Sequence, residues 1–193
     1  TSQKISYSVG ISGKELTARF EESPYYKIIH YKLNSSGGVV SQEGQTVLIP
    51  GGVGDSVAAV ANTYEGYTYK NGYDNNGNKE VRSGILTKDC SKINPLQLKL
   101  YYTVNQDSLK YDANFAGASQ SMTPSGGYTF EKVKVSGNSF SRDGYDFTGW
   151  NTAKNGRGTS YSPGSDYQLT IKEDVLYAQW TAKKCKLIFN GNL

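Results

Sequence analysis

The residue types that carry most enzyme and metal chemistry are sparse in this chain of 193 residues. It contains one histidine, His30, and two cysteines, Cys90 and Cys185, which stand far apart in the sequence. A catalytic nucleophile needs a base within hydrogen-bond reach, and a structural zinc site needs four clustered ligands. No nucleophile-elbow or paired-carboxylate motif accompanies His30. We therefore expect a protein that is not an enzyme, that binds no metal or other cofactor, and whose two cysteines are free thiols.

Two short runs invite comparison with phosphate and calcium sites. Residues 51–55, Gly-Gly-Val-Gly-Asp, are glycine-rich like a phosphate-binding loop. They lack the Lys-Ser/Thr pair that such a loop requires, and no helix is expected after them. Residues 74–77, Asp-Asn-Asn-Gly, form the one local cluster of oxygen ligands, but without the spacing that brings several oxygens to one calcium ion. Turn chemistry explains both runs better.

Tyrosine, with 16 copies, is the residue type most suited to contacting a partner. Its ring and hydroxyl together offer apolar area and a hydrogen bond, as at many protein interfaces. Strand alternation places Tyr67 and Tyr69 on one face, but Tyr101 and Tyr102 on opposite faces, so one of the latter pair is expected in the core and the other exposed. The candidate binding residues are Tyr64, Tyr67, Tyr69, Tyr73 and Tyr102.

The overall composition is that of strands and turns. The chain holds 22 glycines, and no run of ten or more residues keeps a 3.6-residue apolar period. The net charge of +4 is mild, and the basic residues are scattered, with only Lys183 and Lys184 adjacent. A nucleic-acid surface needs a clustered basic stripe, and a membrane helix needs about eighteen apolar residues in succession. We expect neither nucleic-acid binding nor membrane insertion, and a monomer. Because the chain begins at Thr1 without a leader pattern, we take it for a piece of a longer protein.

An internal repeat organises the sequence. Residues 29–34, Ile-His-Tyr-Lys-Leu-Asn, match residues 109–114, Leu-Lys-Tyr-Asp-Ala-Asn, in their apolar, aromatic and asparagine positions. Residues 187–192 match both, so the three copies begin 80 and 78 residues apart. Repetition at a nearly constant period indicates an array of modules. The predicted division is a hairpin or tail of a preceding module at 1–24, complete modules at 25–105 and 106–181, and the start of another at 182–193.

Short strands alternate with turn signals through both modules. Alternating apolar residues at 4–11 and 15–20 predict a hairpin before them. Residues 71–79 are a predicted loop, residues 61–65 a helical turn, and residues 138–141 a turn or short helix. The predicted strands are 26–33, 44–49, 56–60, 67–69 and 96–104 in the first module, and 108–113, 128–135, 145–150, 167–171 and 175–180 in the second. The expected fold is mainly β with short helical segments (α+β).

Aromatic residues gather in the stretch from 142 to 180, which closes the second module. Trp150 and Trp180 could act as flat platforms for sugars, but a domain this small needs the large apolar area of tryptophan in its own core. The predicted core residues of the stretch are Tyr145, Phe147, Trp150, Leu176 and Trp180.

The same stretch resembles a known family. The run YDAN at 111–114, then RDGYDFTGWNTAKNGRGTSYSPGSDYQL at 142–169, then DVLYAQW at 174–180 resembles the internalin-type B repeat, also called the Listeria–Bacteroides repeat, over about residues 108–181. One departure is Asn-Phe-Ala-Gly at 114–117, where the family usually carries Gly-Gly after the asparagine. The module at about 25–105 is similar to a mucin-binding-protein-type repeat, through residues 28–33, 51–57, 63–67 and 98–104.

These resemblances imply tandem small β-grasp (ubiquitin-like) modules in an elongated array, from a bacterial protein that is secreted or attached to the cell surface or wall. They imply a non-enzymatic stalk or spacer in adhesion. The alternative is a recognition module that itself binds a host surface glycoprotein, a mucin glycan or a peptide.

Overall fold

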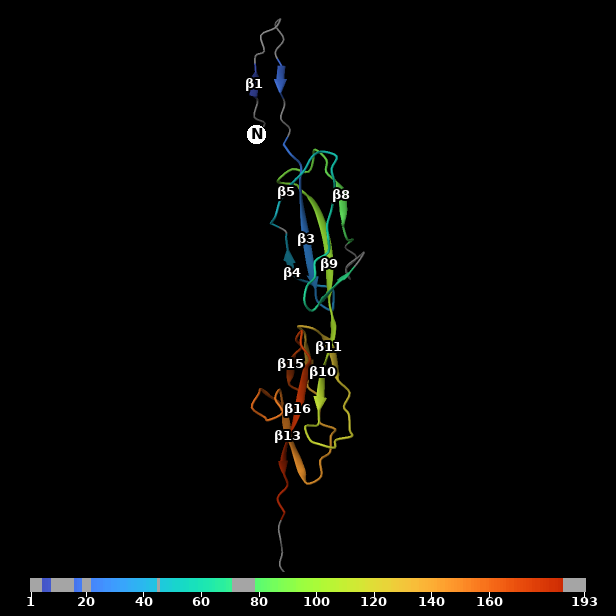
Figure 1. The fold of residues 1–193 in the computed structure, drawn as a ribbon, viewed down its shortest axis with the longest axis vertical. Coiled ribbons are helices and arrows are strands. Elements are labelled where there is room, and N and C mark those ends of the chain that lie inside the picture. Colours follow the sequence, from blue (N-terminus) through green and yellow to red (C-terminus); the bar gives the residue numbers. More distant parts are fainter. Residues whose placement is uncertain (1–4, 8–15, 19–21, 45, 71–78, 186–193) are drawn as a thin grey trace, which may run out of the picture. The chain divides into compact units, whose positions relative to one another are not determined.

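The computed structural model describes residues 5–7, 16–18, 22–44, 46–70 and 79–185 (Figure 1). The chain separates into two compact units, residues 1–103 and 104–193. The described parts of both units are built from strands and turns alone, so the mainly β prediction is confirmed, while the predicted helical content is absent from them. No helix there is long and apolar enough to cross a membrane.

A parallel pair of long strands forms the centre of unit 1. β3 pairs with β9 in parallel, from Tyr26 opposite Leu96 to Leu33 opposite Thr103. The sheet order is β4-β3-β9-β7, and β5 also pairs with β3. β6 and β8 form a separate antiparallel ribbon, and β1 with β2 pair as the described parts of the predicted N-terminal hairpin. The strands are β1 (Ile5–Tyr7), β2 (Leu16–Ala18), β3 (Tyr25–Leu33), β4 (Val39–Glu43), β5 (Ile49–Pro50), β6 (Ser56–Ala58), β7 (Tyr67–Lys70), β8 (Ser83–Ile85) and β9 (Leu96–Val104).

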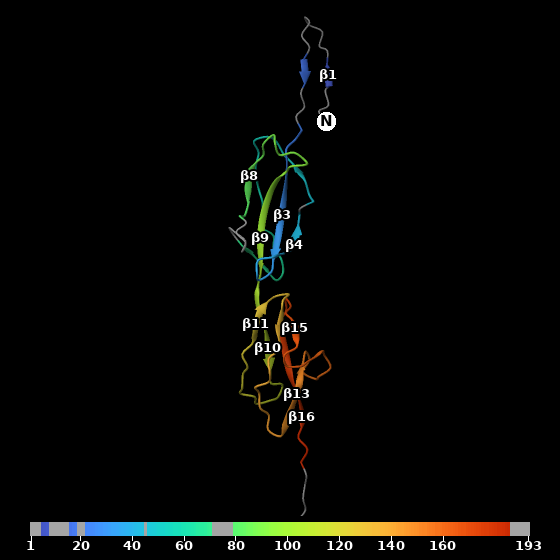
Figure 2. The same ribbon diagram turned by 180° about the vertical axis from the view of Figure 1, so that it is seen from behind.

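Unit 2 follows the same plan, as the view from behind also shows (Figure 2). Its first and last strands, β10 and β16, are again parallel neighbours at the centre of the sheet, whose order is β11-β10-β16-β13-β14. β12 and β15 form a second ribbon. The strands are β10 (Gln106–Asp112), β11 (Ser125–Tyr128), β12 (Lys132–Lys134), β13 (Tyr145–Asn151), β14 (Ser160–Tyr161), β15 (Asp166–Gln168) and β16 (Asp174–Ala182).

Each unit has its own hydrophobic core. In unit 1 one buried cluster consists of Leu98, Leu100 and Tyr102 of β9 with Ala59 from residues 57–61, called the crossing segment below. Ile29, Leu33 and Leu86 are also buried. The core of unit 2 is larger and includes Leu109, Val133, Phe140, Trp150, Leu169 and Leu176. Full burial of one such aliphatic side chain stabilises a fold by about 1.5–3 kcal/mol, which is substantial for modules of this size.

A β-bulge in β13 lets the aromatic residues of the second module share one face. Phe147 and Trp150 are three residues apart, so a regular strand would point them to opposite faces. The register shifts between Phe147 and Gly149, where Gly149 adopts a φ of 144°. The extra residue, Thr148, is exposed, and the rings of Phe147 and Trp150 meet edge to face at 5.0 Å. The bulge therefore turns an uneven aromatic spacing into a single packed cluster.

The helical turn predicted at 61–65 is not formed, and of the turn or short helix predicted at 138–141 only a turn closed by the Asn138 side chain is present. Side chains satisfy the backbone in both segments. At 61–65 the Asn62 N–H donates to the Tyr102 hydroxyl, and Tyr64 forms an isolated bridge with Tyr67. At 138–141 the Asn138 side chain accepts from the Phe140 N–H and donates to the Phe140 carbonyl. Asparagine bonds of this kind compete with helix formation.

Two strand predictions also need correction. Residues 44–49 are largely not a strand; β4 precedes them, and Gly44 has a φ of 77°, which ends the extended run. Residues 128–135 are split into β11 and β12, because Phe130 has a φ of 65°. Of the remaining predicted strands of the two modules, 96–104 coincides with β9 and the others overlap observed strands with shifted ends, while β4, β8 and β14 were not predicted. The predicted loop at 71–79 lies outside the described residues except for its last position, and the third repeat copy at 187–192 lies wholly outside them.

The alignment of the repeat by sequence differs by one residue from the structural alignment of β3 with β10. His30 lies opposite Leu100 in unit 1, whereas Tyr111 lies opposite Leu176 in unit 2. Tyr111 packs against its unit's core, and the corresponding core face of β3 carries Ile28 rather than Ile29. His30 is thus the structural counterpart of Tyr111, although the sequence match pairs Tyr31 with it.

Candidate functional site

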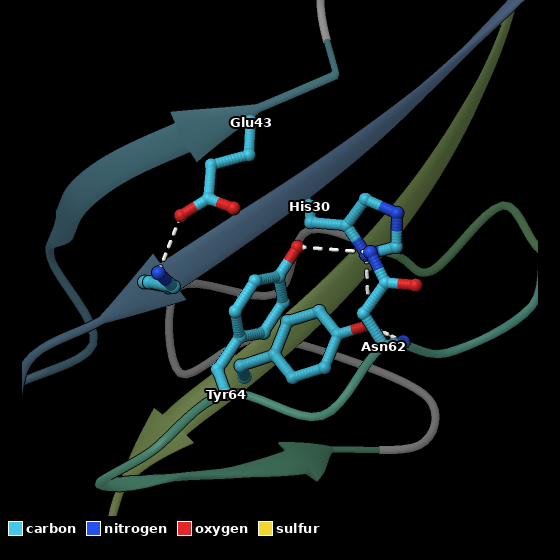
Figure 3. Close-up of polar contacts among 6 residues, drawn as sticks. His30, Glu43, Asn62 and Tyr64 are labelled. Carbon is cyan, nitrogen blue, oxygen red and sulfur yellow. Dashed lines mark hydrogen bonds and ion pairs between the residues drawn. The ribbon is translucent and has the colours of Figure 1, made fainter.

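The strongest candidate site is a pocket of about 460 Å³ in unit 1, beside β3 and β4. Both aliphatic and polar side chains line it. Figure 3 shows the polar lining residues and their contacts in close-up. The apolar lining is Ile28, Val47, Ile49, Ala58 and Val60, and the polar lining is His30, Glu43, Asn62 and Tyr64.

The pocket exists because the strand beside β3 is interrupted. β4 pairs with β3 as far as His30 opposite Glu43, and β5 resumes the pairing at Tyr26. Gly44 follows β4 directly, and its left-handed conformation brings the chain so close to the Ile28 carbonyl that a Cβ would lie 2.4 Å from that oxygen. A glycine is therefore required at this position. The crossing segment packs its residues Val57, Ala59 and Ala61 against the core.

A chain of hydrogen bonds connects His30 with Tyr102 and Asn62. The Asn62 backbone N–H donates to the Tyr102 hydroxyl oxygen at 2.9 Å, and that hydroxyl lies 2.8 Å from His30 Nδ1. Because the hydroxyl oxygen already accepts from Asn62, its own hydrogen can be donated to Nδ1. Burial lowers the pKa of His30, which favours the neutral ring. In the arrangement in which the hydroxyl donates to Nδ1, the proton of the neutral ring resides on Nε2.

A second network of contacts connects Lys32, Glu43, Asn62 and Tyr64. Lys32 donates to Glu43, and its ammonium lies 4.1 Å from the centre of the Tyr64 ring. This hydrogen bond from Lys32 is the main cause that lowers the pKa of Glu43, which therefore stays ionised. Asn62 Nδ2 donates to the Tyr64 hydroxyl at 3.2 Å. Burial raises the pKa of Tyr64, so its hydroxyl stays protonated.

This arrangement is suited to binding rather than to bond cleavage. His30 is bonded to the Tyr102 hydroxyl, which is fully buried, and not to an exposed nucleophile. The one carboxylate in the lining is neutralised by Lys32. The pocket is therefore a nearly uncharged, aliphatic space with hydrogen-bonding groups in its lining, a combination common in ligand sites.

Four of the five candidate tyrosines lie in one cluster. Tyr64, Tyr67 and Tyr69 are partly exposed and pack on Tyr102, which is fully buried. The Tyr64 ring meets that of Tyr102 edge-on at 4.8 Å. Burial, followed by a hydrogen bond to Glu80, raises the pKa of Tyr69 to about 12. Tyr73 lies outside the described residues.

The expectation that only one of Tyr101 and Tyr102 is buried is wrong. Both are buried, at 4 % and 0 % exposure, although they point to opposite faces of β9. The ring of Tyr101 stacks on Tyr31 of the neighbouring strand at 5.2 Å. A cross-strand aromatic pair thus covers the second face.

Sequence reasoning did not assign His30, Lys32, Glu43 or Asn62 to a site. A signal was present in β3, where strand alternation places Ile28, His30 and Lys32 on one face. His30 and Lys32 continue the face that begins with the apolar Ile28. Polar residues at such positions indicate that this part of the face does more than pack in the hydrophobic core. Glu43 and Asn62 carried no comparable local signal, because they reach the pocket only through strand pairing and the crossing segment.

The aromatic residues expected in the core of the second module are packed to different extents. Trp150 is 1 % exposed and donates from Nε1 to the Ser136 carbonyl at 3.0 Å, and Leu176 is fully buried. Trp180 and Phe147 are partly buried beside this core, and Trp180 Nε1 donates to the Ala113 carbonyl at 2.7 Å. Tyr145 is also only partly buried, with the Arg142 guanidinium 3.7 Å from the centre of its ring.

The glycine-rich run at 51–55 is a turn whose backbone also bonds to Pro24 and Leu86. Asp55 accepts a hydrogen bond from the Gly52 N–H at 2.6 Å, so the protein's own carboxylate occupies the place of an anion. The run at 74–77 lies outside the described residues. Within the described ranges, no group of three or more His, Cys, Asp or Glu side chains could hold a metal ion. Cys90 is partly buried and Cys185 is exposed, and both are free.

The fold and the repeat define a mainly β protein in which one strand plan occurs twice. Residues 103–179 match the family described as the Listeria-Bacteroides repeat domain, so the resemblance predicted for the second module is confirmed. The match gives no family for the module predicted at 25–105.

Two proteins of Evansella cellulosilytica are similar to part of the chain. One is 30 % identical over 93 residues, which are 48 % of this chain and 14 % of the relative. The other is 32 % identical over 91 residues, which are 47 % of this chain and 10 % of the relative. The names of both describe them as membrane proteins, and the second name adds that the protein is glycine-rich. The chain thus spans only a small part of the length of these relatives.

Proposed function

We propose that this chain is a non-enzymatic segment of a bacterial protein on the cell surface or cell wall, where its repeated modules act as a spacer in adhesion. The observation that carries the proposal is the common strand plan of the two units, each with a parallel pair of strands at the centre of its sheet, β3 with β9 and β10 with β16. Arrays of such modules commonly serve as extended supports. The family match at 103–179 and the membrane-protein names of the relatives support a surface location.

Both units are, in this proposal, β-grasp-like modules without the usual helix. The central parallel pair, flanked by antiparallel strands, is the arrangement that such a module requires. In unit 1 the crossing segment, with Val57, Ala59 and Ala61 packed on the core, takes the place of the helix. The similarity of this unit to a mucin-binding-type repeat belongs to the same proposal.

Small-angle scattering on the whole chain tests the spacer role. β9 ends at Val104 and β10 begins at Gln106, so one residue, Asn105, connects them. A spacer should scatter as a monomer lengthened along one axis. Insertion of a flexible Gly-Ser linker after Asn105 is the control, since it should broaden the distribution of lengths. A compact particle, or a profile unchanged by the linker, would contradict a semi-rigid spacer.

A recognition role is the second candidate, favoured by the pocket and the tyrosine cluster of unit 1. The partner would be a host surface glycoprotein, a mucin glycan or a peptide. A glycan array and a mucin pull-down with the whole chain test the first two partners. Signals at background level would exclude a host glycoprotein and a mucin glycan as partners under those conditions. A peptide would then be the remaining candidate.

A further inference from the structure

We infer that the pocket of unit 1 is a docking site for an extended peptide, which inserts one aliphatic side chain between Val47 and Val60 and hydrogen-bonds its peptide group to His30 and Asn62. This inference goes beyond the spacer role and does not depend on it.

The walls of the pocket select an aliphatic group. Ile28, Val47, Ile49, Ala58 and Val60 line it, and the aromatic lining residues are His30 and Tyr64. The Tyr64 ring has the Lys32 ammonium over it and contacts Tyr102 and His30 edge-on. Sugars usually stack on free aromatic faces, so this lining favours an aliphatic side chain.

Two apolar residues at the pocket remain exposed and can contact a partner. Val60 is 76 % exposed and Val47 is 57 % exposed, although both line the pocket. Large aliphatic side chains at such exposure gain free energy when a partner covers them. An inserted side chain would cover both.

The polar lining residues match the donor and acceptor of one peptide group. When Nδ1 of His30 accepts from the Tyr102 hydroxyl, Nε2 carries the hydrogen. His30 is one of the residues that line the pocket, so its ring borders the space that a ligand would fill. Asn62 donates through Nδ2 to Tyr64, which leaves Oδ1 as an acceptor. A peptide carbonyl can accept from Nε2 while a peptide N–H donates to Oδ1.

The charge of the pocket agrees with a neutral ligand group. Glu43 is held by Lys32, so the carboxylate in the lining is part of an ion pair rather than a free charge. A phosphate or a lone cation would leave one of these charges poorly compensated. A peptide backbone carries no charge and avoids this cost.

Nuclear magnetic resonance of the whole chain with three small probes tests the site. The probes are acetyl-Ala-Leu-Ala-amide, acetyl-Ala-Ala-Ala-amide and N-acetylglucosamine, each at millimolar concentration. His30 is the only histidine, so its imidazole nitrogen signals report on the pocket directly. The leucine peptide should shift Nε2 and the amides around the pocket, and should bind about tenfold or more tightly than the alanine peptide.

Matched variants complete the experiment. Val60→Glu should abolish the response to the leucine peptide, whereas Val53→Glu, at a residue 60 % exposed that does not line the pocket, should keep it. Val47→Glu serves in place of Val60→Glu if the latter perturbs the fold. The inference is overturned if the leucine peptide produces no shift, or binds no better than the alanine peptide. An equal or stronger response to N-acetylglucosamine would also overturn it in favour of a sugar site, while the scattering test of the spacer stands apart from all these outcomes.

Discussion

At the scale of single residues, His30 is the group whose chemistry differs most between the folded and unfolded chain. It is 6 % exposed, and its burial lowers the pKa of the ring. The nearby Glu43 opposes this effect, but burial is the larger cause. The position held by Tyr111 in unit 2 is thus occupied in unit 1 by a group that resists protonation.

The stability of unit 1 should therefore fall on mild acidification. A histidine with a lowered folded pKa binds fewer protons when folded, so the free energy of unfolding decreases as pH falls through the unfolded value of about 6.5 toward the folded pKa. Native-state hydrogen exchange at pH 7.5 and 5.5, compared at matched intrinsic rates, measures this in unit 1. The amides of unit 2, which has no histidine among its residues, are the internal control. His30→Gln should remove the dependence over this range; its persistence in that variant would assign it to another group.

The two tryptophans should not be equivalent in stability. Trp150→Ala empties a fully enclosed aromatic site and should lower the free energy of unfolding of unit 2 by about 3–5 kcal/mol. Trp180 is only partly buried, so Trp180→Ala should cost less, despite the lost hydrogen bond to the Ala113 carbonyl. Urea unfolding followed by the fluorescence of the remaining tryptophan compares the two. A larger loss in Trp180→Ala would show that the burial order does not decide stability here.

At the scale of elements, the β13 bulge decides which aromatic residues can pack together. The register shift between Phe147 and Gly149 depends on a backbone conformation that glycine adopts more readily than other residues. The bulge and the core are therefore coupled, because a regular strand would turn either Phe147 or Trp150 away from the cluster.

Gly149→Ala should destabilise unit 2 by about 1–3 kcal/mol through backbone strain. A Cβ at this position would lie no closer than 3.6 Å to the Tyr161 carbonyl, so a steric clash is not the cause. Gly126→Ala is the matched control, since Gly126 also lies in a strand, has no positive φ and leaves open space for a Cβ. Thermal unfolding of both variants checks the prediction, and equal effects would contradict it.

Elements with long alternating patterns were predictable, while those that depend on turns were not. β3 and β9 were predicted almost to the residue, because both are long stretches rich in aliphatic and aromatic residues between turn signals. β4, with the sequence Val-Val-Ser-Gln-Glu, lacks that alternation, and the more apolar residues that follow it were preferred. The left-handed conformations of Gly44 and Phe130, which end strands, are not visible in apolar periodicity.

The candidate site was less predictable than the fold, for a related reason. The tyrosines were found because their residue type alone suggests a surface role. The pocket depends on pairs distant in sequence, such as His30 with Tyr102 and Asn62 with Tyr102, which are 72 and 40 residues apart. Only the pairing of β3 with β9 and the course of the crossing segment bring these groups together.

At the scale of the whole molecule, the two units contain separate cores and divide the chain between them. Both tryptophans lie in unit 2, so tryptophan fluorescence reports on that unit alone. An array of modules that fold individually loses one module at a time, which is what a spacer needs if it is to survive local damage.

Unfolding of unit 2 should therefore leave unit 1 folded. In a Trp150→Ala chain brought to a urea concentration that abolishes the native fluorescence of Trp180, the amide signals of β3 and β9 should keep their native positions up to Thr103. The reason is that their protection arises from Leu98, Leu100 and Tyr102, which belong to the core of unit 1. Leu100→Ala provides the reciprocal case, in which unit 1 should lose its signals while the fluorescence of Trp150 and Trp180 stays native. Simultaneous loss of both units in either variant would mean that the chain folds as one cooperative body, and the modular proposal would then have to be abandoned.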